Sequence, residues 1–169
     1  MNKSTVLTLC LTLMVASVGY AQKFGYCNSA LLLTNIPEMK QADSELKSYQ
    51  TQLTKKGQEM VKSLQDKAAD LKRKEEQGAI SPKELETQNT KLGEEQQAIA
   101  KYEQEVYEKL AQKREELFQP ILERVNTAMS EVAKENGFVF VFDTNSNMVL
   151  YANESLDVTK LVKAKLHIE

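Results

Sequence analysis

Residues that could carry out catalysis are scattered along this sequence, and none stands beside the partner that its chemistry requires. The single histidine is His167, close to the end of the chain. Adjacent acids that could act as a general acid and base occur at Glu75-Glu76, Glu94-Glu95 and Glu115-Glu116. All three pairs fall in charged stretches that are typical of a solvated helix face. No base stands beside a nucleophile, so we predict that the protein is not an enzyme.

Cofactor sites are not indicated either. The sequence has no Gly-rich phosphate loop and no Cys/His cluster with zinc-ligand spacing. The turn Asp143-Thr144-Asn145 offers oxygen ligands for calcium, but it lacks the spacing and the later glutamate of an EF-hand. We therefore predict no bound metal and no cofactor.

The first 21 residues have the pattern of a secretory signal peptide. Lys3 supplies the positive charge, an apolar run follows from Val6 to Val18, and small residues precede Gln22. We predict cleavage after Ala21 and an exported, soluble chain. Loss of Lys3 leaves 21 basic against 24 acidic residues, a net charge of −3. This slightly acidic balance does not favour nucleic acid as a partner.

Cys27 is the one cysteine that remains once the predicted signal peptide, with Cys10, is removed. A single cysteine in an exported chain cannot form an internal disulfide. We interpret Cys27 as a small, partly buried apolar residue; the alternative is a reactive or intermolecular thiol.

A charged helical stretch runs from Glu38 to Asn136 and is divided by the segment 78–82. Gly78 suits the left-handed residue that closes a helix, and Ser81, Pro82 and Glu84 form the start signal of the next one. The sequence thus predicts a helical hairpin arm over residues 37–136, with its tip near 78–82.

Each helix of this arm has one narrow apolar stripe. The first stripe is Leu46, Tyr49, Leu53, Gly57, Met60, Leu64, Ala68 and Leu71; the second is Leu85, Leu92, Ile99, Tyr102, Val106, Leu110 and Leu117. Such stripes can pack against each other in a coiled coil and bury little else. Met60 and Ile80 are candidate contacts for a client, with ordinary hairpin packing as the alternative. Gly57, Gly93 and Pro120 are candidate hinges.

The two helices have unequal lengths, about 60 Å and about 80 Å at 1.5 Å per residue. Folding back at the tip brings Met39 near Pro120, so residues 121–136 have no partner in the hairpin. Their apolar stripe is wider and consists of Ile121, Leu122, Val125, Ala128, Met129, Val132 and Ala133. We expect this segment to pack on a small β body formed by residues 22–36 and 137–169.

This body is too small to stand alone. Expected strands are 24–28, 138–143 and 148–151, and Asp157 is the expected cap of a short last helix. An apolar strand with two buried faces needs cover on each side, and exposed sheet edges invite association. The chain is therefore an α+β protein that we expect to be an obligate oligomer. The residues expected at its interface are Phe24, Tyr26, Phe138, Phe140, Phe142, Val149 and Tyr151.

Both ends of the mature chain carry family motifs. These are Lys23-Phe24-Gly25-Tyr26-Cys27-Asn28, Leu31-Leu32-Leu33 and Ile36-Pro37-Glu38 at the front, then Val132-Ala133, Gly137-Phe138, Val141-Phe142-Asp143, Val149-Leu150-Tyr151 and Asp157-Val158-Thr159. In these motifs the sequence resembles the Skp/OmpH family of periplasmic chaperones.

The resemblance implies a homotrimer in which strands from three copies form a barrel that carries three helical tentacles. It also implies an ATP-independent holdase that binds unfolded outer-membrane proteins in a cavity between the arms and prevents their aggregation. Contact with lipid or lipopolysaccharide is not carried over, because no basic cluster here matches such a site. The alternative function is a structural coiled-coil spacer or adaptor in an envelope assembly.

Overall fold

The computed structural model describes residues 22–146 and 148–168, and the predicted signal peptide lies outside them. The elements are β1 (Lys23–Cys27), α2 (Ser29–Asn35), α3 (Pro37–Glu76), α4 (Pro82–Glu135), β2 (Phe138–Asp143), two 3-10 turns (Thr144–Ser146 and Glu154–Leu156) and α5 (Thr159–Leu166). They divide into two compact units: the body, residues 22–30 and 127–167, and the arm, residues 31–126. No helix of the described residues is long and apolar enough to cross a membrane.

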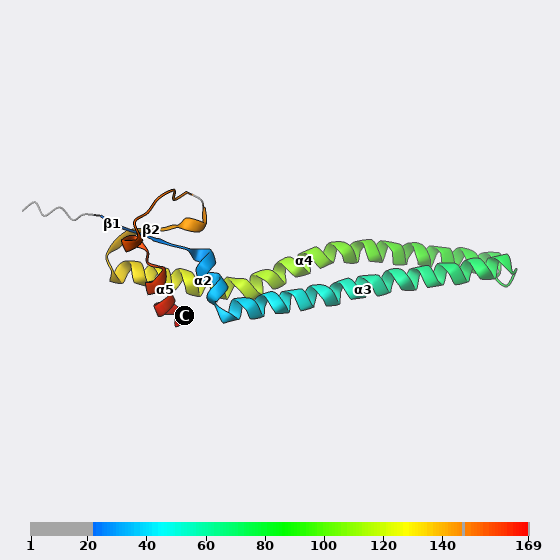
Figure 1. Cartoon of the computed structure of the whole chain (residues 1–169). Coiled ribbons are helices and arrows are strands. Elements are labelled where there is room, and N and C mark those ends of the chain that lie inside the picture. The colour runs from blue at the N-terminus through cyan, green and yellow to red at the C-terminus, as the bar shows by residue number, and fades with distance from the viewer. Residues whose placement is uncertain (1–21, 147, 169) are drawn as a thin grey trace, which may run out of the picture. The chain divides into compact units, whose positions relative to one another are not determined.

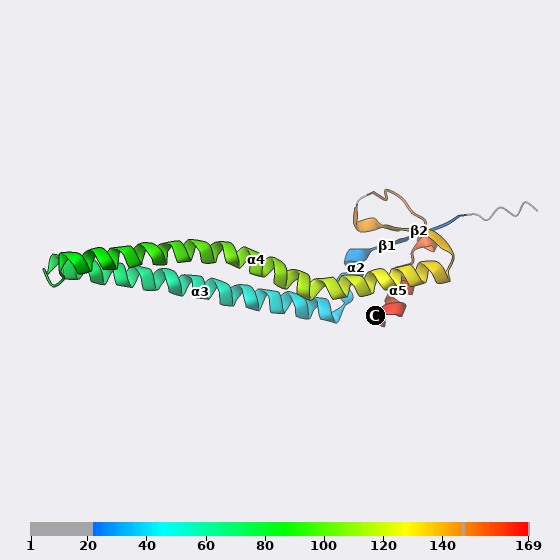
Figure 2. The same cartoon turned by 180° about the vertical axis from the view of Figure 1, so that it is seen from behind.

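In the arm, α3 and α4 lie side by side and run in opposite directions (Figures 1 and 2). Helix α3 ends in a Schellman motif, in which Ala79 N–H donates to Lys74 and Gly78 N–H to Glu75. Gly78 has φ +62° and so takes the left-handed conformation that this motif needs. Helix α4 then starts at Pro82, where Ser81 Oγ accepts a hydrogen bond from Glu84 N–H at 3.3 Å. Both caps are of the kind that the sequence predicts.

The contact between α3 and α4 is narrow and is crossed by ion pairs. Leu53, Leu71 and Tyr102 are buried in it, and most other residues of the two predicted stripes are half-buried. Cross-helix ion pairs join Glu38 to Arg124 at 2.7 Å, Glu45 to Lys113 at 2.8 Å and Lys67 to Glu95 at 2.5 Å. Exposed pairs of this type contribute little stability each, but together they favour one register between the helices.

The body contains a two-stranded parallel sheet, β1 with β2. The other edge of β1 is also occupied, because Tyr26 bridges to Asp157 and Val158 N–H donates to the Tyr26 carbonyl at 2.9 Å. Under the sheet, Cys27, Val158, Thr159 and Val162 are buried. Burial raises the pKa of the Cys27 thiol, against a weaker lowering effect from the Thr159 hydroxyl. This agrees with our interpretation of Cys27 as a core residue.

The prediction of a third strand is wrong. Residues 148–151 are not in a strand, and Met148, Leu150 and Tyr151 are at least 84% exposed. Both edges of β1 are already used, and the segment does not pair with the outer edge of β2, which has no partner among the described strands. In the described residues this segment is instead an irregular loop between the two 3-10 turns.

Three helix boundaries or faces also differ from expectation. Residues Ser29–Asn35 form α2, a helix that we did not anticipate. Helix α3 begins at Pro37, which has no backbone N–H and so needs no capping side chain there. Asp157 caps α5 as expected, because it accepts a 2.8 Å hydrogen bond from Thr159 N–H, but it does so from one residue before the N-cap position, Val158. The stripe after Pro120 is narrower than expected, since Leu122 is 38% exposed.

Asp143 fastens the end of β2 to the start of α2. Its carboxylate accepts hydrogen bonds from Ser29 Oγ at 2.6 Å, Ser29 N–H at 3.2 Å and Asn145 N–H at 2.9 Å. Partial desolvation raises the pKa of this carboxyl, but the bonds from Ser29 and Asn145 outweigh it, so the net pKa is lowered. The ionised form is therefore the one that the fold stabilises.

We predict that Asp143→Ala lowers the free energy of unfolding by about 1 kcal/mol at pH 7, the usual effect of losing a cap. Because the folded pKa is lowered, this stability is present above the ordinary aspartate pKa and is lost as pH falls through the folded value. Urea denaturation at pH 7 and at pH 3 should show a difference between variant and wild type that shrinks at the lower pH. Asp43→Ala, on the exposed surface of α3, is the control. An equal loss at both pH values would contradict this account.

Candidate functional site

No catalytic or metal centre is assembled in the described part of the chain. No group of three or more His, Cys, Asp or Glu side chains there could hold a metal ion. His167 is exposed at the end of α5, and of the three acidic pairs only Glu95 is half-buried, where it pairs with Lys67. The candidate functional features are instead surfaces, one on the body and one on the arm.

The body carries an exposed aromatic face, which we define as Phe24, Phe140 and Phe142 with the loop residues Met148, Leu150 and Tyr151. The three phenylalanine rings lie 6.1–6.3 Å apart between centroids, within the range of favourable aromatic packing. Each is 41–56% exposed, and the loop residues are more so. Contiguous exposed apolar side chains of this size usually mark an interaction site.

The residues expected at the oligomer interface divide into two groups. Phe24, Phe140, Phe142 and Tyr151 belong to the aromatic face, whereas Tyr26, Phe138 and Val149 are half-buried. Of the latter, Tyr26 and Val149 still line the hollow beside that face.

Phe138 lies apart from this group. The strand register shifts by one residue, so that Lys23 pairs with Phe138 and Phe24 with Phe140. The Phe138 ring consequently lies beside Gly25, with the Lys23 ammonium 4.3 Å from its centroid. The sequence gives no sign of this bulge, because it depends on which residues the two strands pair.

The arm has shallow hollows along its helix–helix contact. Ile80 lines one at the tip together with Leu71 and Leu92. Met60 lines another with Ile99, and Lys56 and Lys67 are also among its lining residues. Both predicted client residues are half-buried and border hollows, which is compatible with either of their two interpretations.

Sequence reasoning missed Val61 and Tyr107. They line a further hollow with Tyr102 and Val106, and Tyr107 is 77% exposed. An aromatic residue next to a stripe position in an otherwise charged helix was the available signal. The candidate hinges are all inside helices: Gly57 in α3, Gly93 and Pro120 in α4. Bending at these positions stays a prediction.

Comparison with known proteins identifies the family to which this chain belongs. The sequence profile of outer membrane protein (OmpH-like) matches residues 23–166. The chain belongs to the OmpH-like family. The resemblance inferred from the end motifs is thereby confirmed.

The fold is also shared with a solved OmpH-like protein. A crystal structure of an OmpH-like outer membrane chaperone candidate from Caulobacter crescentus superimposes on this chain with a TM-score of 0.73. The two chains are 20% identical over 86% of this chain and 84% of the other, so the likeness shows the fold. No curated protein matches the chain.

We predict that Gly25→Ala disturbs the sheet beneath the aromatic face. A Cβ at this position would lie 3.1 Å from Phe138 Cε1 and from Val158 Cγ1, so the packing must shift. Overpacking of this kind costs about 1–3 kcal/mol. The matched control is Gly93→Ala in α4, where a Cβ would meet nothing within 4 Å and alanine is the better helix former. In urea denaturation, Gly25→Ala should unfold at a lower urea concentration than wild type, and Gly93→Ala should not. An unchanged midpoint for Gly25→Ala would contradict the prediction.

Proposed function

We propose that this OmpH-like protein is an ATP-independent holdase chaperone that binds unfolded outer-membrane proteins and prevents their aggregation. The observation that carries this proposal is the family match over residues 23–166. It is supported by the shared fold with the Caulobacter crescentus protein, which is described as a candidate chaperone. The predicted signal peptide, cleaved after Ala21, would place the protein in the periplasm.

The surface chemistry of the arm suits this activity. Its hollows are shallow and are lined by apolar and charged side chains together, as with Met60 and Ile99 beside Lys56 and Lys67. Each can hold one or two side chains of an extended polypeptide and can release them again. Several weak contacts on linked arms then give useful affinity without a deep pocket, which is what a binder of many unfolded sequences needs.

Self-association would supply those linked arms. The aromatic face leaves six large apolar side chains in water, and β2 has no partner on its outer edge among the described strands. Both are liabilities that further copies of the same chain can cover. A homotrimer held together through the body is the assembly that the family resemblance implies, and it would enclose a cavity for the client between three arms.

The holdase activity can be tested with purified mature protein, residues 22–169. A urea-unfolded outer-membrane barrel is diluted into buffer with and without excess protein, and aggregation is followed by light scattering. We expect scattering to fall to a small fraction of its value without the protein, and to do so without ATP. The control is an equal mass of a folded helical protein of similar charge. Unchanged aggregation would contradict the proposal and favour the spacer or adaptor function.

The assembly can be tested separately by replacing one residue of the aromatic face. We predict that Phe140→Asp dissociates the trimer, because a charge buried in an apolar interface without a partner is strongly unfavourable. Sedimentation velocity should show a trimer for wild type and a smaller species for the variant. Tyr107→Asp, an equally drastic change on the exposed arm surface, should leave the mass unchanged. A monomeric wild type, or a Phe140→Asp trimer, would contradict the predicted interface.

A further inference from the structure

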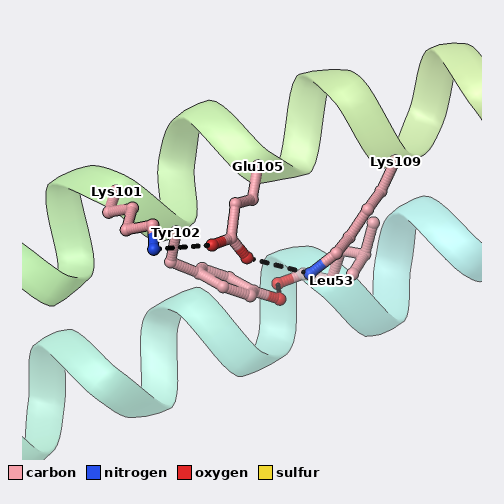
Figure 3. Close-up of polar contacts among 5 residues, drawn as sticks. All are labelled: Leu53, Lys101, Tyr102, Glu105 and Lys109. Atoms are coloured by element: carbon pink, nitrogen blue, oxygen red, sulfur yellow. Dashed lines mark hydrogen bonds and ion pairs between the residues drawn. The ribbon is translucent and has the colours of Figure 1, made fainter.

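The middle of the arm is marked by a buried tyrosine that reaches from one helix to the other. Tyr102 of α4 is 6% exposed, and its hydroxyl donates to the carbonyl oxygen of Leu53 in α3 at 3.0 Å (Figure 3). The ring lies against Gly57, where an added Cβ would be 3.5 Å from Tyr102 Cε1. A buried tyrosine hydroxyl requires a hydrogen-bond partner, and here the facing helix backbone provides it.

Charged side chains surround this contact. The ammonium groups of Lys56 and Lys109 lie 5.2 Å and 5.6 Å from the ring centroid. Glu105 holds Lys109 at 3.0 Å and Lys101 at 3.9 Å (Figure 3). The hydrogen bond between them raises the pKa of Lys109 and lowers that of Glu105, so both remain charged. The cations therefore stay over the ring, which favours its present position.

Few residues are buried between this contact and the tip. In the segment 64–97 Leu71 is the one buried residue, whereas Ala42, Leu53, Ile121 and Val125 are buried elsewhere in the arm. Gly93 lies in the same segment, and nothing comes within 4 Å of its added Cβ. Few buried contacts and a glycine inside a helix both lower the free energy of local opening.

We propose that Tyr102 is a latch that divides the arm into two mechanical segments. Between the body and Tyr102, the two helices separate from each other only rarely. On the tip side, in residues 64–97, they separate without breaking the contact at Tyr102, and they bend at Gly93. Gly57 is then the small residue against which the Tyr102 ring packs, and it does not have the hinge role that the sequence predicts for it. A Cβ at Gly57 would make ordinary van der Waals contact with the ring, so a small residue at this position is enough to accommodate it.

The latch is a property of the chain itself, so its test needs no client and does not depend on the proposed chaperone function. Hydrogen exchange followed by mass spectrometry is measured on the mature chain, residues 22–169. In wild type we expect amides of segment 64–97 to exchange faster than those of residues 50–60 and 98–106. Tyr102→Ala should raise exchange around the latch more than tenfold, to the level of the tip segment. Strands β1 and β2 should keep their protection.

Three further variants test the proposal even if Tyr102→Ala unfolds the arm. Tyr102→Phe, which retains the ring and loses the hydrogen bond, should raise exchange around the latch by a few-fold only. Gly57→Ala leaves room for the ring and should not raise it, whereas Gly93→Ala should slow exchange in segment 64–97 by up to about fivefold. Uniform exchange along the wild-type arm would overturn the proposal. So would a Gly57→Ala variant that loosens the arm as much as loss of the tyrosine does.

Discussion

The pairing of β1 with β2 is the constraint on which the rest of the fold depends. The two strands are parallel, although more than a hundred residues separate them in the chain. Parallel neighbours cannot be joined by a tight turn and require a crossover connection. In this protein the crossover is the whole helical section from α2 to α4. The arm is therefore an enlarged connection between two short strands, which hold its two ends.

The narrowness of the helix–helix contact explains the character of the arm. Each helix has one apolar stripe, so most of its surface is charged and solvated, and few residues such as Leu53 and Leu71 are buried. Stability must then come from the few buried cross-helix contacts, among them Tyr102, and the three ion pairs favour one register between the helices. The same narrow contact between the helices leaves shallow hollows at the surface. A weakly packed, charged arm with such hollows suits reversible binding of unfolded chains better than it suits a rigid spacer.

Local chemistry was predictable wherever short-range rules decide the structure. The caps at Gly78 and Ser81, the two apolar stripes and the strand at Phe138–Asp143 all follow from spacing and residue type. Prediction failed where pairing partners decide. Residues 148–151 have the composition of a strand but pair with no strand of the described residues, and α2, from Ser29 to Asn35, was not anticipated. The role of Asp143 as the cap for Ser29 was likewise hidden, because 114 residues separate the two.

By itself the sequence determined the helical hairpin, its tip, the absence of catalytic spacing and the family, since each depends on neighbouring residues or on motifs along the chain. Tertiary structure decided the parallel register with its bulge, which places Phe138 beside Gly25 and leaves Phe24, Phe140 and Phe142 exposed together. It also decided that Tyr102 meets Gly57. Both outcomes depend on which surfaces come together after folding, and the period of a pattern specifies a face without naming the residue that will lie against it.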